Sequence, residues 1–223
     1  MTEQAGAYGE LAMNLHDRVG VLATVESVLE FAVEVLPYDH ASVLLMHRQQ
    51  PRTVAATDEL VTAADQLQVE IGEGPSLLAI KDHEDVLVED TMTDKRWPRW
   101  APTAAANGIR SALAIRLHTA HSTSGVLNLV SASPFVFRDG DREAARLLAL
   151  HASIAIASAR LEVSLHEAID SRKEVGQAVG RLMERYQLDP VQAFGVLKRY
   201  SQDRNQRLSS VALHVVERGA LPD

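Results

Sequence analysis

The last quarter of the chain carries apolar residues at three- and four-residue spacing, in three stretches separated by polar breaks. Such spacing places the apolar side chains on one face of a helix. Asp189 and Pro190 mark the first break, because Asp caps helix starts and Pro is tolerated in a first turn. Gly219 and Pro222 mark the end of the third stretch. The pattern predicts three helices whose inward faces are Val175, Val179, Leu182, Met183 and Tyr186, then Ala193, Phe194, Leu197 and Tyr200, then Leu208, Val211, Ala212 and Val215.

Two glycines, Gly176 and Gly180, lie one turn apart inside the first of these helices. A glycine in mid-helix costs roughly 1 kcal/mol relative to alanine, so two of them need a reason. We favour close helix packing, which Ala178 and Ala193 would also permit, over the alternative of ligand contact.

The rest of the chain alternates short apolar runs with turn residues, a pattern typical of strands. A helical pattern comes first, over residues 11–36, and a long helix starts near Asp141. Between them we expect strands at 43–46, 53–56, 86–88, 111–117 and 125–131, a turn at 49–52, and short helices at 63–68, from Pro75, and at 101–107. This order predicts an α+β fold, an antiparallel sheet flanked by helices, followed by the all-α three-helix module.

The long helix carries residues at alternating spacings of four and three from Ile154 to Tyr186, nearly all of them apolar. This is the heptad pattern of a coiled coil, and it predicts that the helix pairs with a second copy of the chain. The expected dimer seam is Ile154, Leu161, Leu165, Ala168 and Val175. Packing of the seam on the chain's own sheet as far as about Leu161 is the alternative, and either arrangement is compatible with a homodimer.

Residues 176–212 read GQAVGRLMERYQLDPVQAFGVLKRYSQDRNQRLSSVA, an array that resembles the ANTAR domain. This family is the three-helix output module of bacterial transcription antitermination regulators. The resemblance implies binding, as a dimer, to paired small stem-loops in nascent transcripts, which favours an antiterminator over a terminator. The family usually has Lys directly after the Ala, whereas Val179 stands there in this chain, which puts one phosphate or loop contact in question.

Polar residues on the three helices are candidates for RNA contact, because unpaired loop bases are recognised by stacking and edge hydrogen bonds. They are Gln177, Arg181, Arg185, Lys198, Arg199, Ser201, Gln202, Asn205 and Arg207. The alternative is that the cations are solvated and that Ser201 and Asn205 only cap or turn the chain. From Ser164 onward there are nine cations and eight anions, against a net charge of −8 for the whole chain. This balance argues against general DNA coating and membrane-surface binding.

The order of elements over residues 14–162 resembles a GAF domain, and three short stretches agree with it: Gly72-Glu-Gly-Pro75, Gly108-Ile-Arg-Ser111 and Gly125-Val-Leu-Asn128. The resemblance implies a small-molecule pocket between the sheet and its crossing segments, near Ala55, Ser76, Leu77, Trp97, Ser111 and Asn128. The cyclic-nucleotide subgroup has Lys and Glu where Leu129 and Arg142 stand, which argues against that ligand. A closed pocket in a domain used only for dimerisation is the alternative.

Composition narrows the chemistry further. The absence of cysteine excludes disulfides, thiolate-bound metals, a cysteine nucleophile and a cysteine-linked bilin. His118 and His121 are closely spaced but stand in an expected loop, so we predict no metal and no covalent cofactor. The run Asp82-His83-Glu84-Asp85 cannot converge from one face and is interpreted as a solvated loop, so no enzymatic activity is expected. No apolar run approaches the roughly 18 residues of a membrane span, and a cytoplasmic protein is expected.

The sequence therefore predicts a flexible N-terminus (1–13), a GAF-like sensor (14–162) and an ANTAR-like RNA-binding domain (163–223). The expected function is that of a ligand-responsive, dimeric antitermination regulator. Its expected partners are RNA stem-loops, a second copy of the chain and a small-molecule effector. A DNA-binding transcription factor and a protein-binding signalling adaptor are the alternatives. The sequence names neither the effector nor the target transcript.

Overall fold

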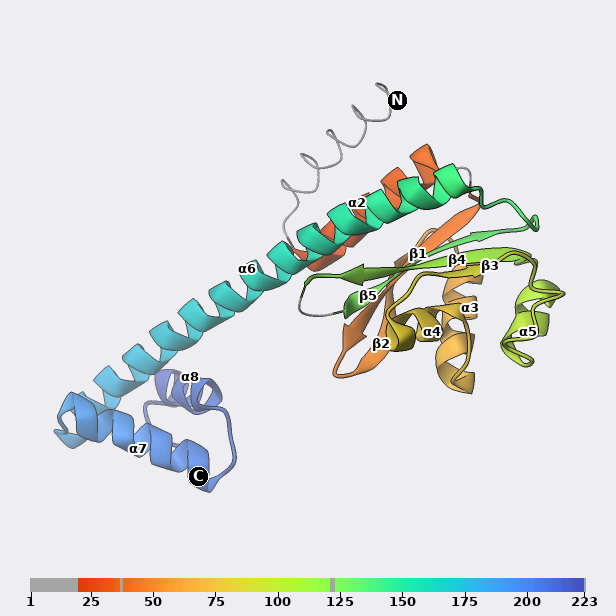
Figure 1. Cartoon of the computed structure of the whole chain (residues 1–223). Coiled ribbons are helices and arrows are strands. Elements are labelled where there is room, and N and C mark those ends of the chain that lie inside the picture. Colours follow the sequence, from red (N-terminus) through yellow and green to blue (C-terminus); the bar gives the residue numbers. More distant parts are fainter. Residues whose placement is uncertain (1–19, 37, 121–122, 223) are drawn as a thin grey trace. The chain divides into compact units, whose positions relative to one another are not determined.

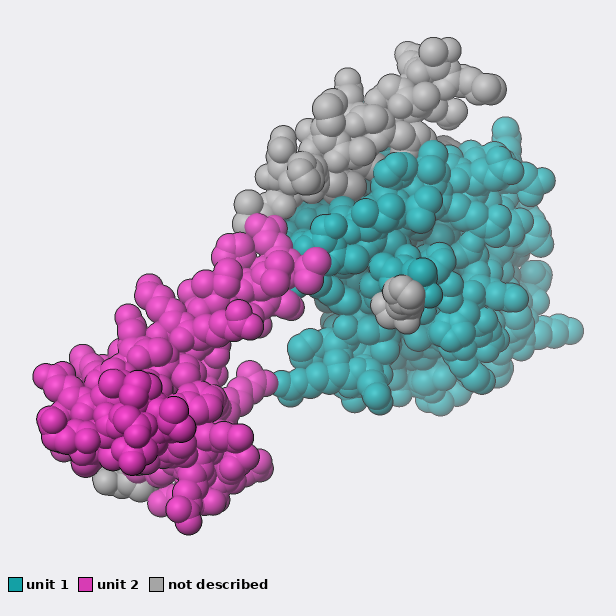
Figure 2. All heavy atoms as spheres, turned by 60° about the vertical axis from the view of Figure 1, so that its left-hand side comes forward, with its two compact units in different colours: residues 1–160 teal, residues 161–223 magenta. Residues whose placement is uncertain are grey.

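The computed structural model describes residues 20–36, 38–120 and 123–222. The chain divides into two compact units, Met1–Arg160 and Leu161–Asp223 (Figure 2). The expected flexible N-terminus, the first turns of the helix expected over 11–36, and His121 lie outside the described residues. The described part of that first helix begins at Val21, directly after Gly20, whose φ is 94°.

The first unit is an α+β structure built on a five-stranded antiparallel sheet, as the sequence predicts (Figure 1). The strand order is β2-β1-β5-β4-β3. The strands are β1 (His40–His47), β2 (Gln50–Ala56), β3 (Val86–Val88), β4 (Ser111–His118) and β5 (Thr123–Ser131). The helices are α2 (Val21–Val35), α3 (Glu59–Ile71), α4 (Pro75–Asp82), α5 (Trp100–Ala106) and the beginning of α6 (Asp139–Tyr186).

Helices cover both faces of this sheet, and each face has its own hydrophobic core. Helices α2 and α6 lie on one face, and α3, α4 and α5 lie on the other (Figure 1). Successive side chains of a strand point to opposite faces. In β5, Leu127 and Leu129 therefore pack in the core under α2 and α6, whereas Val126 and Val130 pack in the core under α3, α4 and α5.

The turn between β1 and β2 lies earlier than expected. It consists of Arg48 and Gln49, whose φ angles are 48° and 67°. A two-residue hairpin turn of this kind requires positive φ, which Gly, Asn or Asp usually supplies. Because neither residue signals such a turn, the sequence misplaced it at 49–52, and β2 begins at Gln50 instead of Thr53.

The helix expected at 63–68 extends over Glu59–Ile71 as α3. Asp58 caps its start, because its carboxylate accepts a hydrogen bond of 2.7 Å from the backbone N–H of Leu60. Gly72 ends it with a φ of 72°, a conformation that glycine adopts without strain. Both boundary signals were present in the sequence and extend the helix by about one turn at each end.

The second unit contains the three predicted helices: the end of α6, then α7 (Pro190–Asp203) and α8 (Leu208–Arg218). Asp189 and Gln192 form a reciprocal capping box at the start of α7, and Pro190 occupies its first turn. Gly219 ends α8 with a φ of 73°. The predicted breaks at Asp189 and Gly219 are therefore confirmed. The fully buried core consists of Ala178, Leu182, Ala193, Leu197, Val211, Ala212 and Val215.

Helix α6 is 48 residues long, and its composition would allow it to cross a membrane. The sequence did not lead us to expect such a segment. Leu148, Ala152 and Ile156 of this helix are completely buried against the sheet. Their neighbours Leu150 and Ile154 lie on an exposed stripe. The helix is thus apolar on two sides, one packed in the core and one exposed, which accounts for its composition.

Replacement of Gly125 by Ala should destabilise the first unit. A Cβ at this position would overlap the backbone carbonyl of Leu44 on the adjacent strand, so β1 and β5 would have to separate. We expect a loss of at least about 2 kcal/mol in the free energy of unfolding, measured by urea denaturation. Gly140→Ala is the matched control, because a Cβ there meets no neighbour within 4 Å. Equal stability of the two variants would contradict the close approach.

Candidate functional site

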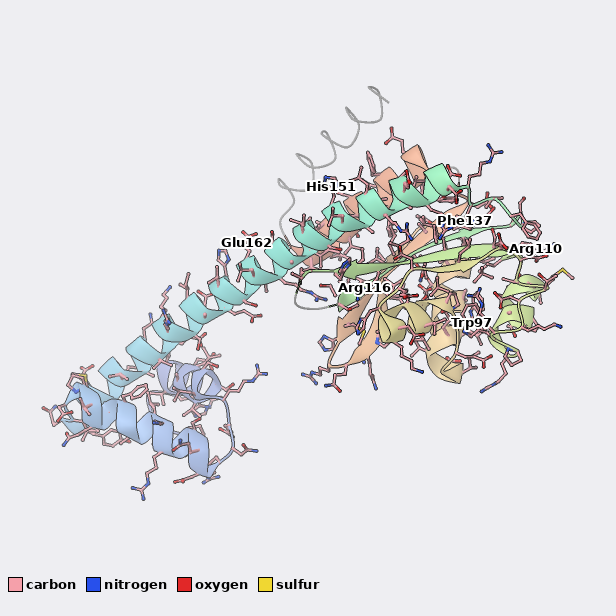
Figure 3. The ribbon with its side chains drawn as sticks, viewed as in Figure 1. Trp97, Arg110, Arg116, Phe137, His151 and Glu162 are labelled. Atoms are coloured by element: carbon pink, nitrogen blue, oxygen red, sulfur yellow. The ribbon has the colours of Figure 1, made fainter. Side chains whose placement is uncertain are left out.

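The six residues expected to line a ligand pocket do not surround one cavity. Ala55 packs against the core under α2 and α6, on the opposite face of the sheet from Trp97. Trp97 is buried on the face covered by α3, α4 and α5 (Figure 3). The hydroxyl of Ser111 donates a hydrogen bond to the backbone carbonyl of Ser133 at 2.7 Å, and Leu77 is half-buried on α4. Of the six, Ser76 and Asn128 are joined by a hydrogen bond.

Ser76 and Asn128 belong to a buried polar network whose centre is Asp65 of α3, a residue that the sequence analysis missed. The Ser76 hydroxyl donates to Oδ1 of Asn128 at 2.9 Å. Nδ2 of Asn128 donates to Oδ1 of Asp65 at 2.9 Å, and Thr53 donates to Oδ2 of Asp65 at 3.0 Å. Gln68 completes the network by accepting a hydrogen bond of 2.8 Å from the backbone N–H of Ser76.

The missed residue did carry a signal. Val61, Asp65 and Gln68 are the buried residues of α3, and they stand four and three positions apart. This is the spacing of one helix face, so the register of Val61 places Asp65 inside. Apolar periodicity alone does not identify this buried face, because two of its three residues, Asp65 and Gln68, are polar.

Asp65 is only 2% exposed, and its environment changes its acidity. Burial raises the pKa of its carboxyl to about 7, although hydrogen bonds from Ser42, Thr53 and Asn128 act to lower it. Among the described residues, no cation forms an ion pair with Asp65. The carboxyl therefore changes its charge near neutral pH inside the protein.

A cavity of about 370 Å³ lies between β2 and α3, beside Asp65. It is lined by Pro51, Arg52, Thr53, Thr62, Asp65, Gln66, Val69 and Glu70. A smaller cavity of about 200 Å³ lies between α3 and α5, with a mostly apolar lining. None of the six expected pocket residues lines either cavity.

The three stretches that resemble the GAF pattern have structural roles. The carboxylate of Glu73 accepts hydrogen bonds from the backbone N–H groups of Arg99 and Trp100, at 2.6 and 2.9 Å, and so caps the start of α5. Arg110 forms a two-pronged ion pair with Asp90, with distances of 3.0 and 3.1 Å. Gly125 permits the close approach of β1. These residues hold the fold in place around the network.

The run at 82–85 was expected to be a solvated loop, but in the structure it is held by specific contacts. Asp82 ends α4, and His83 follows it in a left-handed conformation with a φ of 61°. The carboxylate of Asp85 accepts a hydrogen bond of 2.6 Å from Nε of Arg146 on α6, and another of 3.2 Å from the backbone N–H of Arg116. In the described residues, no group of three His, Asp or Glu side chains has the arrangement of a metal site.

Three of the nine RNA-contact candidates, Arg185, Ser201 and Arg199, have side-chain bonding partners within the second unit. Arg185 donates to the backbone carbonyl of Gly219 at 2.9 Å, at the C-terminal end of α8, where a cation is favourable. Ser201 donates to the carbonyl of Gln206 at 2.6 Å, and Asn205 sits in the turn between α7 and α8 with a φ of 49°. Arg199 lies 3.9 Å from Asp203. Arg207, the N-cap residue of α8, lines a groove that also contains Glu167, Asp170 and Glu174.

Ser201 and Asn205 therefore both take part in the turn between α7 and α8, and contact of their side chains with RNA stays a prediction. Asn is among the few residues that tolerate a left-handed conformation, which explains its presence at this position. A substitution of Asn205 by Ala would strain the turn as well as remove the amide. Gly is the substitution that keeps the backbone conformation.

The helix packing expected at Gly176 and Gly180 is not found. A Cβ at either residue, or at Gly195 of α7, would meet no other described atom within 4 Å beyond its own helix. Three exposed mid-helix glycines thus lower helix stability without serving the core of this unit. Four exposed residues lie near them along α6 and α7 and have no polar partner in the described part of the chain: Gln177, Arg181, Lys198 and Gln202. Phe194 is 41% exposed on α7, although its position in the pattern predicted an inward side chain.

Most residues of the expected dimer seam are exposed, but one of them belongs to the core of the second unit. Ile154, Leu161 and Leu165 are 58%, 61% and 55% exposed, and Ala168 is also exposed. Val175, in contrast, packs against the core of the second unit. The exposed apolar stripe of α6 starts earlier than expected and ends earlier, and it consists of Leu147, Leu150, Ile154, Leu161, Leu165 and Ile169.

The comparison with protein families agrees with both units. The sequence profile of the GAF domain matches residues 21–157, and that of the ANTAR domain matches residues 164–216. The chain belongs to the GAF domain family and carries an ANTAR domain behind it. Among curated proteins, no relative matches this GAF–ANTAR protein. ANTAR is an RNA-binding antitermination domain and GAF is a ligand-sensing domain, and both are regulatory modules.

Several solved structures share the fold of the GAF unit. The GAF domain of an Acinetobacter phosphoenolpyruvate-protein phosphotransferase is 16% identical, covers 72% of this chain and 96% of its own, and has a TM-score of 0.59. The corresponding domain from Coxiella burnetii is also 16% identical, covers 72% and 96%, and has a TM-score of 0.57. Free methionine-R-sulfoxide reductase from Neisseria meningitidis, solved with its substrate, is 14% identical, covers 71% and 91%, and has a TM-score of 0.56. Such distant similarity establishes the fold alone, and the last example shows that the fold also occurs in enzymes.

Replacement of Asp65 by Asn should flatten the pH dependence of stability. The folded-state pKa of about 7 lies above the unfolded value of about 3.9, so between these limits the folded state holds a proton that the unfolded chain has lost. This contribution makes the free energy of unfolding fall as pH rises from about 4 to 7, by up to about 1.4 kcal/mol per pH unit, and level off above. Urea denaturation across this range should show the slope in the unaltered protein and not in Asp65→Asn.

Glu70→Gln serves as the control for that measurement, because Glu70 is an exposed carboxylate of the same helix. Asp39 contributes with the opposite sign, since hydrogen bonds from Ser131 and from the backbone N–H of Ala132 lower its pKa. The difference between Asp65→Asn and the unaltered protein cancels such contributions. An identical pH profile for the two proteins would exclude a titrating Asp65.

Proposed function

We propose that this GAF–ANTAR protein is a ligand-responsive regulator that binds RNA stem-loops in nascent transcripts and promotes transcription antitermination. The observation that carries the proposal is the ANTAR match, which coincides with a compact three-helix unit. The protein acts without catalysis, and it works in the cytoplasm, where nascent transcripts are found. The domain limits of 14–162 for the sensor and 163–223 for the RNA-binding part belong to the same proposal.

The RNA-binding surface that we propose is the outer face of α6 and α7 in the second unit. Exposed glycines at 176, 180 and 195 let a partner's backbone approach these helices closely. Lys198 supplies positive charge on α7, and Arg181 supplies it from α6, with its guanidinium near Gly219 at the end of α8. Gln177 and Gln202 supply amides that can read base edges. Phe194 offers an exposed aromatic ring on which an unpaired base can stack.

Loop bases fit this surface better than a duplex does. The unit has nine cations against eight anions from Ser164 to the end, far from the basic excess that nonspecific duplex binding requires. Stacking and amide contacts with splayed bases depend less on charge. Arg185, Ser201 and Asn205 also have contacts or a turn position within the unit, so we give them a smaller part in RNA binding than the residues above.

Dimerisation is the second part of the proposal. The exposed stripe from Leu147 to Ile169 has the spacing of a coiled coil, and removal of such a stripe from water is favourable. A second copy of the chain would bury it against an identical stripe. Two RNA-binding units in one dimer match two adjacent stem-loops in one transcript.

Replacement of Gly180 by Ala should weaken RNA binding while it stabilises the helix. The added methyl group points into open space in the free protein and raises helix propensity by up to about 1 kcal/mol. In the complex it would stand between the helix and the RNA. We expect about a tenfold loss of affinity, or roughly 1.4 kcal/mol, for a transcript with two adjacent stem-loops, measured by filter binding at fixed salt.

Gly140→Ala is the matched control for this test, because it adds the same methyl group in open space on α6 within the first unit. Its affinity for RNA should not change. Asn205→Gly should also bind normally, since it keeps the turn. Equal affinities of Gly180→Ala and the unaltered protein would exclude this surface. Tight binding to duplex DNA, or no binding to any nucleic acid, would favour a DNA-binding factor or a protein-binding adaptor.

The joint replacement of Leu161 and Leu165 by Lys should dissociate the dimer. Two buried leucines in each subunit contribute several kcal/mol, on the order of 2 kcal/mol each, and buried lysines would repel one another. Sedimentation equilibrium should show half the mass of the unaltered protein. Val163→Lys is the control, since Val163 is an exposed apolar residue that lies away from the stripe on the same helix. Unchanged mass for the double variant would exclude the coiled-coil seam.

A further inference from the structure

The cavity between β2 and α3 contains charged groups of both signs that do not pair with one another. Arg52 stands on β2, and Glu70 and Asp65 stand on α3. Neither Arg52 nor Glu70 forms an ion pair or a side-chain hydrogen bond with any described residue. The cavity therefore offers one free guanidinium group and two carboxyls to a bound molecule.

Asp65 gives this cavity a specific requirement. A buried carboxylate is normally paired with a cation, because its removal from water is costly. The groups that contact it, Ser42 on β1, Thr53 on β2 and Asn128 on β5, are all neutral donors. These hydrogen bonds fix the position of the carboxylate, but none of them brings a positive charge next to it. A cation from outside the chain would supply what the fold lacks.

We propose that the cavity between β2 and α3 binds a free α-amino acid, whose ammonium group pairs with Asp65 and whose carboxylate pairs with Arg52. This inference rests on the proposed ligand-sensing function and names the class of its ligand. Glu70, at the rim, reinforces the preference for an ammonium group. A volume of about 370 Å³ lies at the lower end of the range of small-molecule sites and suits a molecule of this size.

The two charges of the ligand explain why a simple anion or a simple amine is disfavoured. An anion such as a nucleotide phosphate would meet Asp65 and Glu70, which repel it. An amine without a carboxylate would leave Arg52 unpaired, and so would lose one of the two ion pairs. Arg and carboxylate groups pair with two parallel hydrogen bonds, which also fixes the orientation of the ligand.

The test is a binding measurement on the full chain without RNA. Each standard L-amino acid is added separately in a thermal unfolding assay, and those that raise the melting temperature are titrated by calorimetry. We expect at least one to bind, and its N-acetyl derivative and its methyl ester to bind about tenfold more weakly or not at all. Affinity should fall as pH is lowered through about 7, because the ammonium group pairs only with an ionised Asp65.

Two variants test the named contacts. Arg52→Gln changes an exposed side chain without bonding partners in the described residues, so we expect the fold to be kept. This variant should bind the amino acid about tenfold more weakly, and its affinity for the methyl ester should not change. Asp65→Asn should remove the pH dependence of binding together with most of the affinity. Lys81→Gln is the control, because it removes an exposed cation of α4 that does not line the cavity.

The proposal is overturned if no amino acid binds. It is equally overturned if N-acetyl derivatives bind as well as free amino acids, or if Arg52→Gln and Lys81→Gln have the same effect. Because no RNA is present, these outcomes are independent of the stem-loop assay. A chain that binds stem-loops but no amino acid would retain the proposed function and lose this ligand.

Discussion

The packing of one helix constrains the whole molecule. Helix α6 supplies Leu148, Ala152 and Ile156 to the core of the GAF unit, and Ala178 and Leu182 to the core of the ANTAR unit. A side chain buried in one core is not available to another partner. The exposed apolar stripe of α6 starts at Leu147 and ends at Ile169, before the second core begins. A dimer contact through this stripe would end before Val175, where the core of the ANTAR unit begins.

The two proposed sites share one physical property, which is that each lowers the stability of its own unit. Asp65 places an ionisable group in a core, and its charged form is disfavoured there by burial. Gly176, Gly180 and Gly195 weaken two helices, and no contact within the unit compensates for them. Residues that oppose folding where a better choice exists are expected at functional sites. In the two proposals, a bound partner, an ammonium group in one case and RNA in the other, accounts for both.

Local signals predicted most of the fold, and long-range contacts determined what they missed. Pro75, Asp189 and Gly219 mark helix ends through their own backbone chemistry, so they could be read from the sequence. The turn at Arg48 and Gln49 has no Gly, Asn or Asp to mark it. Its positive φ angles are imposed by the pairing of β1 with β2, which the local sequence does not reveal. Asp65 lies on the apolar face of α3 but is polar, and its partners Thr53 and Asn128 are distant in sequence. Val175 satisfies a heptad seam and a helical core equally well, so periodicity alone could not assign it to the core of the ANTAR unit.

Asn128 is the residue through which the cavity can act on α6. Its side chain bonds to Asp65 and Ser76 on one face of the sheet, while its neighbours Leu127 and Leu129 pack on the other face in the core that contains Leu148 and Ile156. A ligand shifts an equilibrium only as far as its affinity differs between two states, and an ammonium group favours the state with an ionised Asp65. Ionisation changes the strength of the hydrogen bonds that Asp65 accepts, and the bond from Asn128 transmits this change to β5. Because β5 lies at the centre of the sheet and protein cores are close-packed, a shift of this strand would also displace the helix layer of α2 and α6. Helix α6 also supplies Ala178 and Leu182 to the ANTAR core, so such a displacement would give the proposed ligand a physical route to the proposed RNA-binding surface.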